Sequence, residues 1–156
     1  MNDMSIDWIC KHHSDLGKEQ LYAILQLRTE VFVVEQKCPY QEVDGRDLQG
    51  DTYHLMGWRD DRLVAYLRLL DPLSPLSQGG NVAIGRVVIA PQARGVGLGH
   101  ELMREALKQI EKVWSGLEIY LGAQAHLQDY YGRYGFVAVG KTYLEDGIPH
   151  VGMRKV

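Results

Sequence analysis

The stretch Pro91–Leu102, PQARGVGLGHEL, places three alternating glycines where the chain enters a helix. Gly95, Gly97 and Gly99 lack a β-carbon, so the backbone can turn tightly here and a ligand can approach its N–H groups. The N-terminus of a helix attracts anions, because its first N–H groups have no partner within the helix. The stretch therefore predicts a phosphate-binding loop, and the spacing of its glycines decides which kind.

Two common phosphate-binding motifs do not fit this spacing. A nucleotide P-loop requires GxxxxGK followed by Ser or Thr, which the sequence lacks. A dinucleotide fingerprint requires its third glycine three residues after the second, whereas Gly99 follows Gly97 by two. The acidic residue expected about twenty positions later would be Glu118, at the start of its predicted strand instead of its end. Both nucleotide interpretations therefore fail.

Hydrophobic periodicity predicts a mixed α/β (α+β) fold around the loop, in the order β-α-β-β-β-α-β-α-β-β. One helix is expected from Gly17 to about Glu35, and a second from within the glycines to about Trp114, with Val113 among its inward residues. Gly135 is placed to end a short third helix. Asp60–Asp61 and Asp146–Gly147 suit tight hairpin turns. The expected strands are Tyr53–Arg59, Leu63–Leu70, Val82–Ala90, Leu117–Ala123, Phe136–Glu145 and His150–Lys155.

Composition limits the class of protein. The 156 residues are 46% hydrophobic without low-complexity tracts, which predicts one domain spanning residues 1–156. A net charge of −3 with scattered Lys and Arg argues against nucleic acid as a partner. The sequence has no membrane-length apolar run and no signal peptide, so a cytoplasmic protein without a membrane partner is expected.

Cysteines and histidines give no metal pattern. Cys10 and Cys38 have no CxxC spacing and are expected to be reduced thiols. There is no HExxH motif, and the six histidines are expected to be surface or loop residues instead of metal ligands. Cys38 precedes a proline and invites an acyl-enzyme interpretation, but no paired histidine is visible, so packing is favoured.

The glycine loop with Arg94 in front of it, and the apolar strand IGRVVIA before Pro91, resembles motif A of the GNAT superfamily of acyl-CoA-dependent N-acetyltransferases. The pattern also fits two residues earlier, from Gln92 to Gly97, but the family's distance from the proline favours Arg94. The resemblance implies that loop amides bind the pyrophosphate of coenzyme A and that the preceding strand end pairs with its pantetheine arm. The residues implied to bind it are Val87, Val88, Ile89, Arg94, Gly95, Val96, Gly97, Leu98, Gly99 and His100.

A second stretch, YGRYGF from Tyr131 to Phe136, resembles motif B of the same family. Gln124 lies seven residues before Tyr131, where the family commonly has an Asn that contacts coenzyme A. The resemblance implies that Gln124 contacts the cofactor and that Tyr131 is the general acid. The alternative is a packing role, because Tyr130, Tyr131 and Tyr134 share a helical face.

Four further segments look like the ElaA-like branch of this family: RTEVFVVEQKCPY from Arg28, EVDGRD ending at Asp47, GAQAH from Gly122 and EDGIPH from Glu145. The resemblance implies a central, mostly antiparallel sheet splayed around the cofactor, with flanking helices. It also implies an acetyl-CoA-dependent N-acetyltransferase that acts on a small-molecule or peptide amine in a ternary complex without a metal. A homodimer is a family-level expectation. The alternative is a non-catalytic acyl-CoA-binding or sensing module.

The general base is left open by the sequence. Some relatives place a Glu five residues before the Asn-like position, where this chain has Ile119. Glu35 is the catalytic candidate, because it follows Arg28 on an otherwise apolar helical stripe of Leu21, Leu25 and Phe32. The alternative is a solvated pair of Arg28 and Glu35 at the rim of the core. His126, Glu145, His150 and a water relay are also open. The loops Lys37–Gly50 and Glu145–His150 are expected to select the amine.

Overall fold

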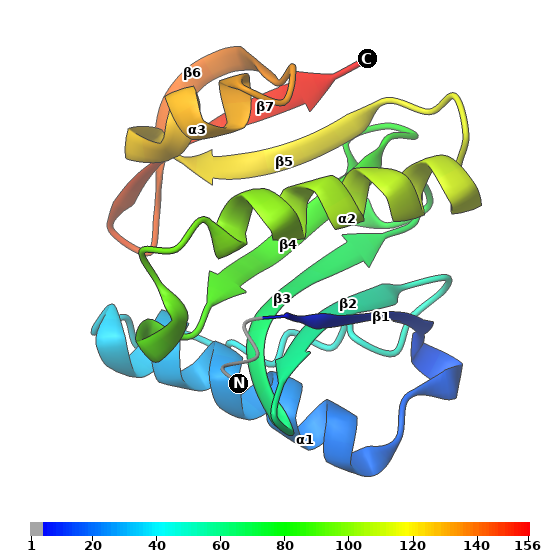
Figure 1. The fold of residues 1–156 in the computed structure, drawn as a ribbon. Coiled ribbons are helices and arrows are strands. Elements are labelled where there is room, and N and C mark those ends of the chain that lie inside the picture. Colours follow the sequence, from blue (N-terminus) through cyan, green and yellow to red (C-terminus); the bar gives the residue numbers. More distant parts are fainter. Residues whose placement is uncertain (1–4) are drawn as a thin grey trace.

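One mixed sheet, with strand order β1-β2-β3-β4-β5-β7-β6, organises the computed structural model, which describes residues 5–156 (Figure 1). Neighbouring strands are antiparallel except for β4 and β5, which are parallel. The predicted order and the mixed fold class are confirmed. The strands are β1 Asp7–His12, β2 Tyr53–Arg59, β3 Arg62–Leu70, β4 Val82–Ile89, β5 Ile119–Gln124, β6 Val137–Glu145 and β7 Ile148–Lys155. The helices are α1 Lys18–Arg28, η2 Thr29–Glu35, α2 Leu98–Val113 and α3 Gln128–Gly132, besides four short 3₁₀ turns.

Both predicted hairpin turns are present. Asp60 and Asp61 have φ angles of 49° and 62° between the paired residues Arg59 and Arg62. The turn between β6 and β7 has φ angles of 51° at Asp146 and 79° at Gly147. Two consecutive residues with positive φ give a turn whose twist matches the flanking strands. These turns fix the register of the two hairpins.

The first predicted helix reaches Glu35, but it changes type after Arg28. The chain leaves the α-helix there and continues as a π-helix, η2, up to Glu35. The wider turn is visible in its hydrogen bonds: the Gln36 N–H donates to the Val31 carbonyl at 3.0 Å and the Cys38 N–H to the Val33 carbonyl at 3.1 Å. Residues five apart are therefore bonded, and the 3.6-residue stripe drawn through Glu35 does not continue.

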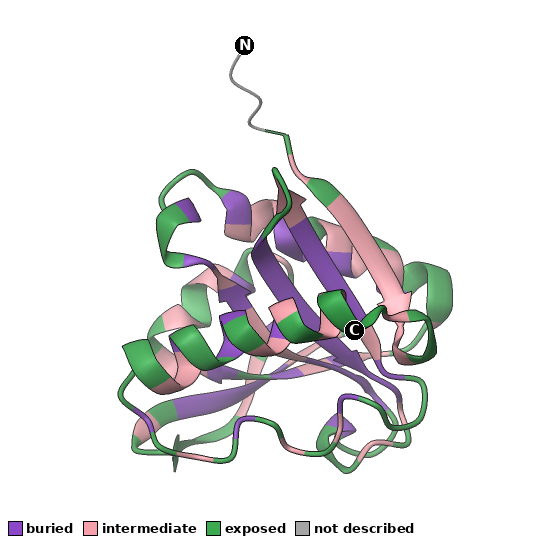
Figure 2. Ribbon diagram, turned by 90° about the horizontal axis from the view of Figure 1, so that it is seen from below, coloured by how far each residue is buried: buried purple, intermediate pink, exposed green. Residues whose placement is uncertain are grey.

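The core lies along the central strands, which Figure 2 shows as the main buried region. On β3, every residue from Leu63 to Leu70 is buried. The inward face of α2 buries Leu98, Leu102, Met103, Ala106 and Ile110. Val113, predicted to face inward, is 36% exposed because it is the last residue of the helix.

The sheet opens between β4 and β5. Their parallel pairing covers only Val82–Ile84 and Ile119–Leu121, after which the strands part (Figure 1). On its other side β4 stays paired with β3 as far as Ile89. Arg86 adopts a φ of 55° where the β3–β4 register shifts, which marks a bulge. The stretch after Ile84 therefore has one free edge, and the predicted splay is confirmed.

Candidate active site

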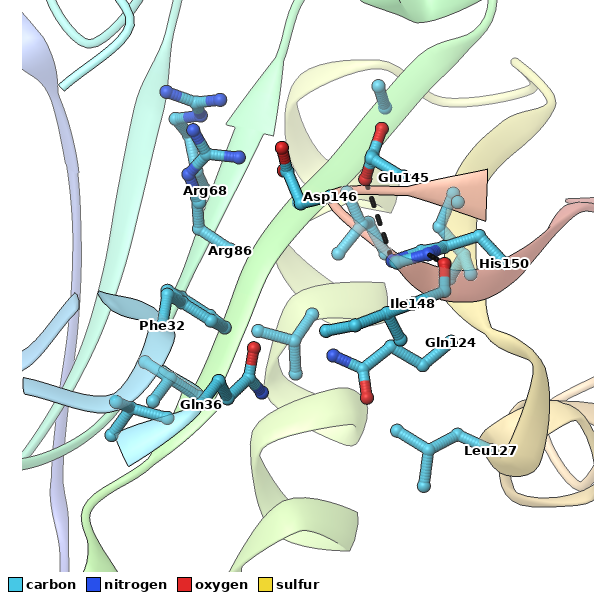
Figure 3. A pocket seen from close by; sticks show the side chains of 18 of the residues that line it. Phe32, Gln36, Arg68, Arg86, Gln124, Leu127, Glu145, Asp146, Ile148 and His150 are labelled. Atoms are coloured by element: carbon cyan, nitrogen blue, oxygen red, sulfur yellow. Dashed lines mark hydrogen bonds and ion pairs between the residues drawn. The ribbon is translucent and has the colours of Figure 1, made fainter. Parts of the chain in front are cut away.

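A cleft of about 750 Å³ occupies the space between the parted strands. Its walls come from η2, β4, β5, α3 and the β6–β7 hairpin. Figure 3 shows labelled side chains from η2, β4, β5 and the hairpin around it. The cleft brings together seven of the predicted site residues: Glu35, Val87, Val88, Ile89, Arg94, Gln124 and Tyr131. The loop from Gly95 to His100 follows Arg94 directly but does not line the cleft itself. The two predicted motifs therefore lie at neighbouring places in the fold.

The glycine loop presents free backbone donors at the start of α2. Gly95 and Gly97 have φ angles of 88° and 78°, which side chains disfavour, and a β-carbon at either would meet nothing within 4 Å. The N–H groups of residues 95–99 donate to no acceptor among residues 5–156. Open space, unpaired donors and a helix N-terminus together suit a pyrophosphate.

Gly99 differs from the other two glycines. A β-carbon there would lie 2.9 Å from the Tyr130 hydroxyl, closer than real side-chain contacts allow. Tyr134, in the turn after α3, shares a hydrogen bond with His100 Nδ1. Gly99 and His100 therefore hold α3 against the start of α2, a packing role that the sequence did not suggest.

Arg94 and Glu35 form a pair at the edge of the cleft. The guanidinium donates to both Glu35 carboxylate oxygens at 2.8 and 2.7 Å, and its Nε donates to the Ile89 carbonyl at 3.2 Å. The hydrogen bonds from Arg94 lower the pKa of Glu35. Both side chains are about two-fifths exposed. Glu35 thus lies beside the glycine loop and the open edge of β4.

Tyr131 is the tyrosine of α3 that faces the cleft. Its side chain is buried between the rings of Tyr130, at 5.1 Å, and Phe136, at 6.3 Å. Burial raises the pKa of Tyr131 to about 12. Its hydroxyl has no hydrogen-bond partner within the described part of the chain, whereas Tyr130 and Tyr134 contact the α2 terminus and lie outside the cleft. Of the three tyrosines, Tyr131 therefore lines the cleft, whereas Tyr130 and Tyr134 pack against α2.

The far end of the cleft is polar and acidic. Glu145, Asp146 and His150 come from the β6–β7 hairpin, and Arg86 faces them from β4 (Figure 3). The Cys38 Sγ–H donates to the Asp146 carbonyl at 3.3 Å, so the segment after η2 is joined to the hairpin turn. Both loops expected to select the amine meet at this end.

A cluster of buried charges beside the cleft was missed by sequence analysis. Arg28, Arg68 and Arg86 from α1, β3 and β4 bind Glu42, Asp44 and Asp47 of the irregular segment before β2. Arg28, which is fully buried, lies 2.6 Å from both the Glu42 and Asp47 carboxylates. Arg68 lies 2.8 Å from Asp44, and Arg86 2.7 Å from Glu42. The interpretation of Arg28 and Glu35 as a rim pair is wrong, because Arg28 points into this cluster. Three acidic residues within six positions of a loop could have indicated this cluster.

Two histidines are not the surface or loop residues that were expected. His54 is fully buried between the Tyr66 hydroxyl at 2.7 Å and the Asp47 carbonyl at 2.9 Å, and His150 is buried on β7. No group of three potential metal-ligating side chains occurs within residues 5–156. Cys10 and Cys38 are free thiols. Across the same residues no helix is long and apolar enough to span a membrane.

Comparison with known proteins agrees with the geometry. The family model for the acetyltransferase (GNAT) domain matches residues 12–156. The chain belongs to the GNAT acetyltransferase family. Protein ElaA of Escherichia coli K12 is 50% identical over 153 residues, covering 96% of each chain. The family resemblance of the two motifs and the ElaA-like branch are thereby confirmed.

Solved structures share the fold of this chain. The crystal structure of an acyl-CoA N-acyltransferase from Pseudomonas aeruginosa has a TM-score of 0.93 at 66% identity and covers 97% of this chain and 100% of that one. The crystal structure of E. coli ElaA has a TM-score of 0.90 at 49% identity, with 97% and 99% covered. An aminoglycoside 6'-N-acetyltransferase complexed with coenzyme A shares the fold at 14% identity, with a TM-score of 0.69 and 94% and 96% covered. This GNAT protein is an acyltransferase.

Proposed function

We propose that this acyltransferase uses acetyl-CoA to acetylate a primary amine by direct attack in a ternary complex. The observation that carries the proposal is the cleft that opens where β4 and β5 part, with unpaired loop donors at one side and Tyr131 in its wall. The same loop and strand edge are the places where the family resemblance puts coenzyme A. A thioester supplies the activated acetyl group, and the protein supplies position and proton transfer.

The residues fit the cofactor along its length. The N–H groups of Gly95–Gly99 suit the pyrophosphate because they are unpaired hydrogen-bond donors. The Arg94 guanidinium suits it because it is positively charged. The free edge of Val87–Ile89 suits an arm that adds to the sheet like another strand. Gln124 ends β5 beside this edge and offers an amide to the same arm. These assignments include every predicted cofactor residue except His100, whose N–H donates to the Gly97 carbonyl and whose ring contacts Tyr134.

The proposed acid is Tyr131. A thiolate leaving group needs a proton, and the raised pKa of about 12 keeps the Tyr131 phenol protonated at neutral pH. The hydroxyl has no described partner that would compete for its hydrogen. A buried donor with its proton in place is what the departure of coenzyme A requires.

The acceptor end suits a cationic amine. The charges of Arg28, Arg68 and Arg86 are balanced by Glu42, Asp44 and Asp47, and Glu35 is balanced by Arg94. Glu145 and Asp146 add two negative charges at the polar end of the cleft. Alkylamines have a pKa of about 10.4, so all but roughly one in a thousand molecules arrive as ammonium ions at neutral pH. An acidic entrance favours their binding.

The function is tested by following coenzyme A thiol release from acetyl-CoA with a panel of amines: spermidine, lysine, a peptide with a free N-terminus and ethylamine. Release that depends on at least one amine, together with mass-spectrometric detection of its acetylated product, is the expected result. Tight acetyl-CoA binding without release on any amine would favour the sensing module instead. A cytoplasmic location, a single domain and a homodimer stay predictions.

The catalytic role expected for Glu35 stays a prediction with a defined test. The Glu35 carboxylate accepts two hydrogen bonds from Arg94, which lower the pKa of Glu35. A lower pKa makes Glu35 a weaker base. We therefore expect Glu35→Gln to raise KM for acetyl-CoA about fivefold with little change in kcat, because it loosens Arg94. Steady-state kinetics at varied acetyl-CoA concentration give the answer. A large fall in kcat at unchanged KM would instead support Glu35 as the base.

A further inference from the structure

The acceptor amine must lose a proton, and His150 is the buried side chain best placed to take it. His150 lies on β7, directly opposite Gln124 at the end of β5, where the sheet has begun to open. Its side chain is only 10% exposed, yet it lines the cleft. Figure 3 shows its ring at the polar end, between Glu145 and Gln124. Imidazole changes charge between about pH 5 and 8, the range in which a base for this reaction works.

One hydrogen bond assigns the tautomer of the ring. His150 Nδ1 lies 2.7 Å from the Ile148 carbonyl oxygen. A carbonyl oxygen only accepts, so Nδ1 must carry the hydrogen. In the neutral ring the lone pair is therefore on Nε2, and Nε2 is the atom that can accept a proton.

Two contacts from β6 hold the ring in place. His150 Nε2 lies 3.5 Å from Glu145 Oε2, a separation at which two lone pairs face one another while the ring is neutral. Once Nε2 has gained a proton, the same pair becomes an ion pair, which stabilises the charged ring. The Tyr143 ring is stacked on His150 at 5.9 Å, which fixes its plane.

We propose that His150 Nε2 is the general base that deprotonates the acceptor ammonium, and that Glu145 is a positioning residue that stabilises the resulting imidazolium. The assignment rests on the proposed acetyl transfer and names its missing proton acceptor. The charged and titratable groups around the ring are Tyr143, Glu145 and Asp146 of the hairpin, exposed His126 at the same cleft, Tyr131 on α3, and Arg86 on the opposite wall.

The proton balance closes with His150 and Tyr131. Nε2 takes one proton from the ammonium, and the freed nitrogen lone pair forms the N–C bond with the acetyl carbon as the C–S bond breaks. The sulfur receives the Tyr131 hydroxyl proton, and Tyr131 regains a proton from the nitrogen of the new amide. His150 then releases its proton to solvent. An ammonium ion and a thioester thus give an amide, a thiol and one proton.

The first experiment compares two amines with different need for a base. Ethylamine is protonated at neutral pH, whereas trifluoroethylamine is largely neutral because fluorine withdraws electrons. We expect His150→Gln to lower kcat about 100-fold with ethylamine but only severalfold with trifluoroethylamine. In this variant the ethylamine rate should keep rising with pH toward the ionisation of the amine itself, about 10.4, because only the free amine then attacks. Glu145→Gln should lower kcat with ethylamine less than His150→Gln does, and should keep part of the difference between the two amines.

His126→Gln is the matched comparison, because it makes the same change at the other histidine of the cleft. Wild-type sensitivity to the choice of amine should persist in this variant. Loss of that sensitivity in His126→Gln, or equal defects of His150→Gln with both amines, would overturn the assignment. Coenzyme A affinity, measured calorimetrically, should stay within about twofold of wild type in all variants and shows that they are folded.

A second measurement needs no acceptor. Long-range ¹H–¹⁵N NMR of the whole chain reports which ring nitrogen carries the hydrogen, and His150→Gln identifies the signal. We expect hydrogen on Nδ1 and none on Nε2 at a pH where the ring is neutral. Hydrogen on Nε2 would overturn the proposal even if an acceptor is found. If no amine releases coenzyme A, that result counts against acetyl transfer. The NMR measurement can still be interpreted, because it needs no acceptor.

Discussion

Tyr131→Phe is expected to lower kcat for acetyl transfer about 1000-fold, while the dissociation constant of coenzyme A changes less than about twofold. The change removes one oxygen from a ring that is packed edge-on against Tyr130 and Phe136, so the ring can keep its place. The hydroxyl has no described partner, and its removal leaves no buried group without a hydrogen bond. The loss should therefore appear in the departure of the thiolate alone. Steady-state kinetics and calorimetry with coenzyme A measure the two quantities.

The matched control is Tyr130→Phe, the same change at the adjacent residue of α3. The Tyr130 hydroxyl lies against Gly99 and outside the cleft, so its loss should lower kcat by less than about fivefold. A coenzyme A analogue with a better leaving group provides a second test, since it needs less help from an acid. Equal turnover of wild type and Tyr131→Phe would remove Tyr131 from the mechanism.

Much of the fold could be predicted because the signals are local. Asp146–Gly147 encodes its own left-handed turn, and the alternation of the flanking strands sets the register. The glycines at the start of α2 predict both a helix start and an open loop. Each of these features depends on neighbours within a few residues, which a single sequence displays directly.

The features that were missed depend on distant partners. The break at Arg28 arises where the side chain turns into carboxylates fourteen and nineteen positions away, which no helical period reveals. The π-helix then moves Glu35 to Arg94, fifty-nine positions later. Gly99 and His100 belong to the predicted cofactor motif, yet their contacts with Tyr130 and Tyr134 are visible only in the folded chain. The motifs therefore located the site, but only the folded chain shows which of their residues pack and which line the cleft.

The charge cluster explains how an irregular loop can help to build a rigid site. The segment between η2 and β2 has no regular secondary structure, but three of its carboxylates bind arginines from three separate elements. Tyr40, in the same segment, donates to Glu42 at 2.9 Å and lines the acceptor end of the cleft. Because charges buried in this way need their partners, loosening one arginine affects both stability and the cleft wall.

Arg28→Met is accordingly expected to lower the free energy of unfolding by about 3 kcal/mol. Methionine fills similar space, but it donates none of the four hydrogen bonds that Arg28 makes to Glu42 and Asp47. The cost stays near the low end for a broken buried pair, because Arg86 still binds Glu42 and Arg68 still binds Asp47. In urea the unfolding midpoint should fall by roughly 1–2 M. Limited proteolysis should cut first within residues 36–52.

Two variants separate the charge effect from a general loss of packing. Adding Asp47→Asn to Arg28→Met removes a charge left short of partners, and the double variant should be more stable than the sum of the single effects predicts. Lys108→Met breaks an exposed ion pair with Glu105 on α2, where solvent screens the charges, and should cost less than about 0.5 kcal/mol. Additive effects of the Arg28 and Asp47 changes would show that these charges do not interact. An Arg28→Met midpoint equal to that of Lys108→Met would show that the cluster contributes no more than a surface pair.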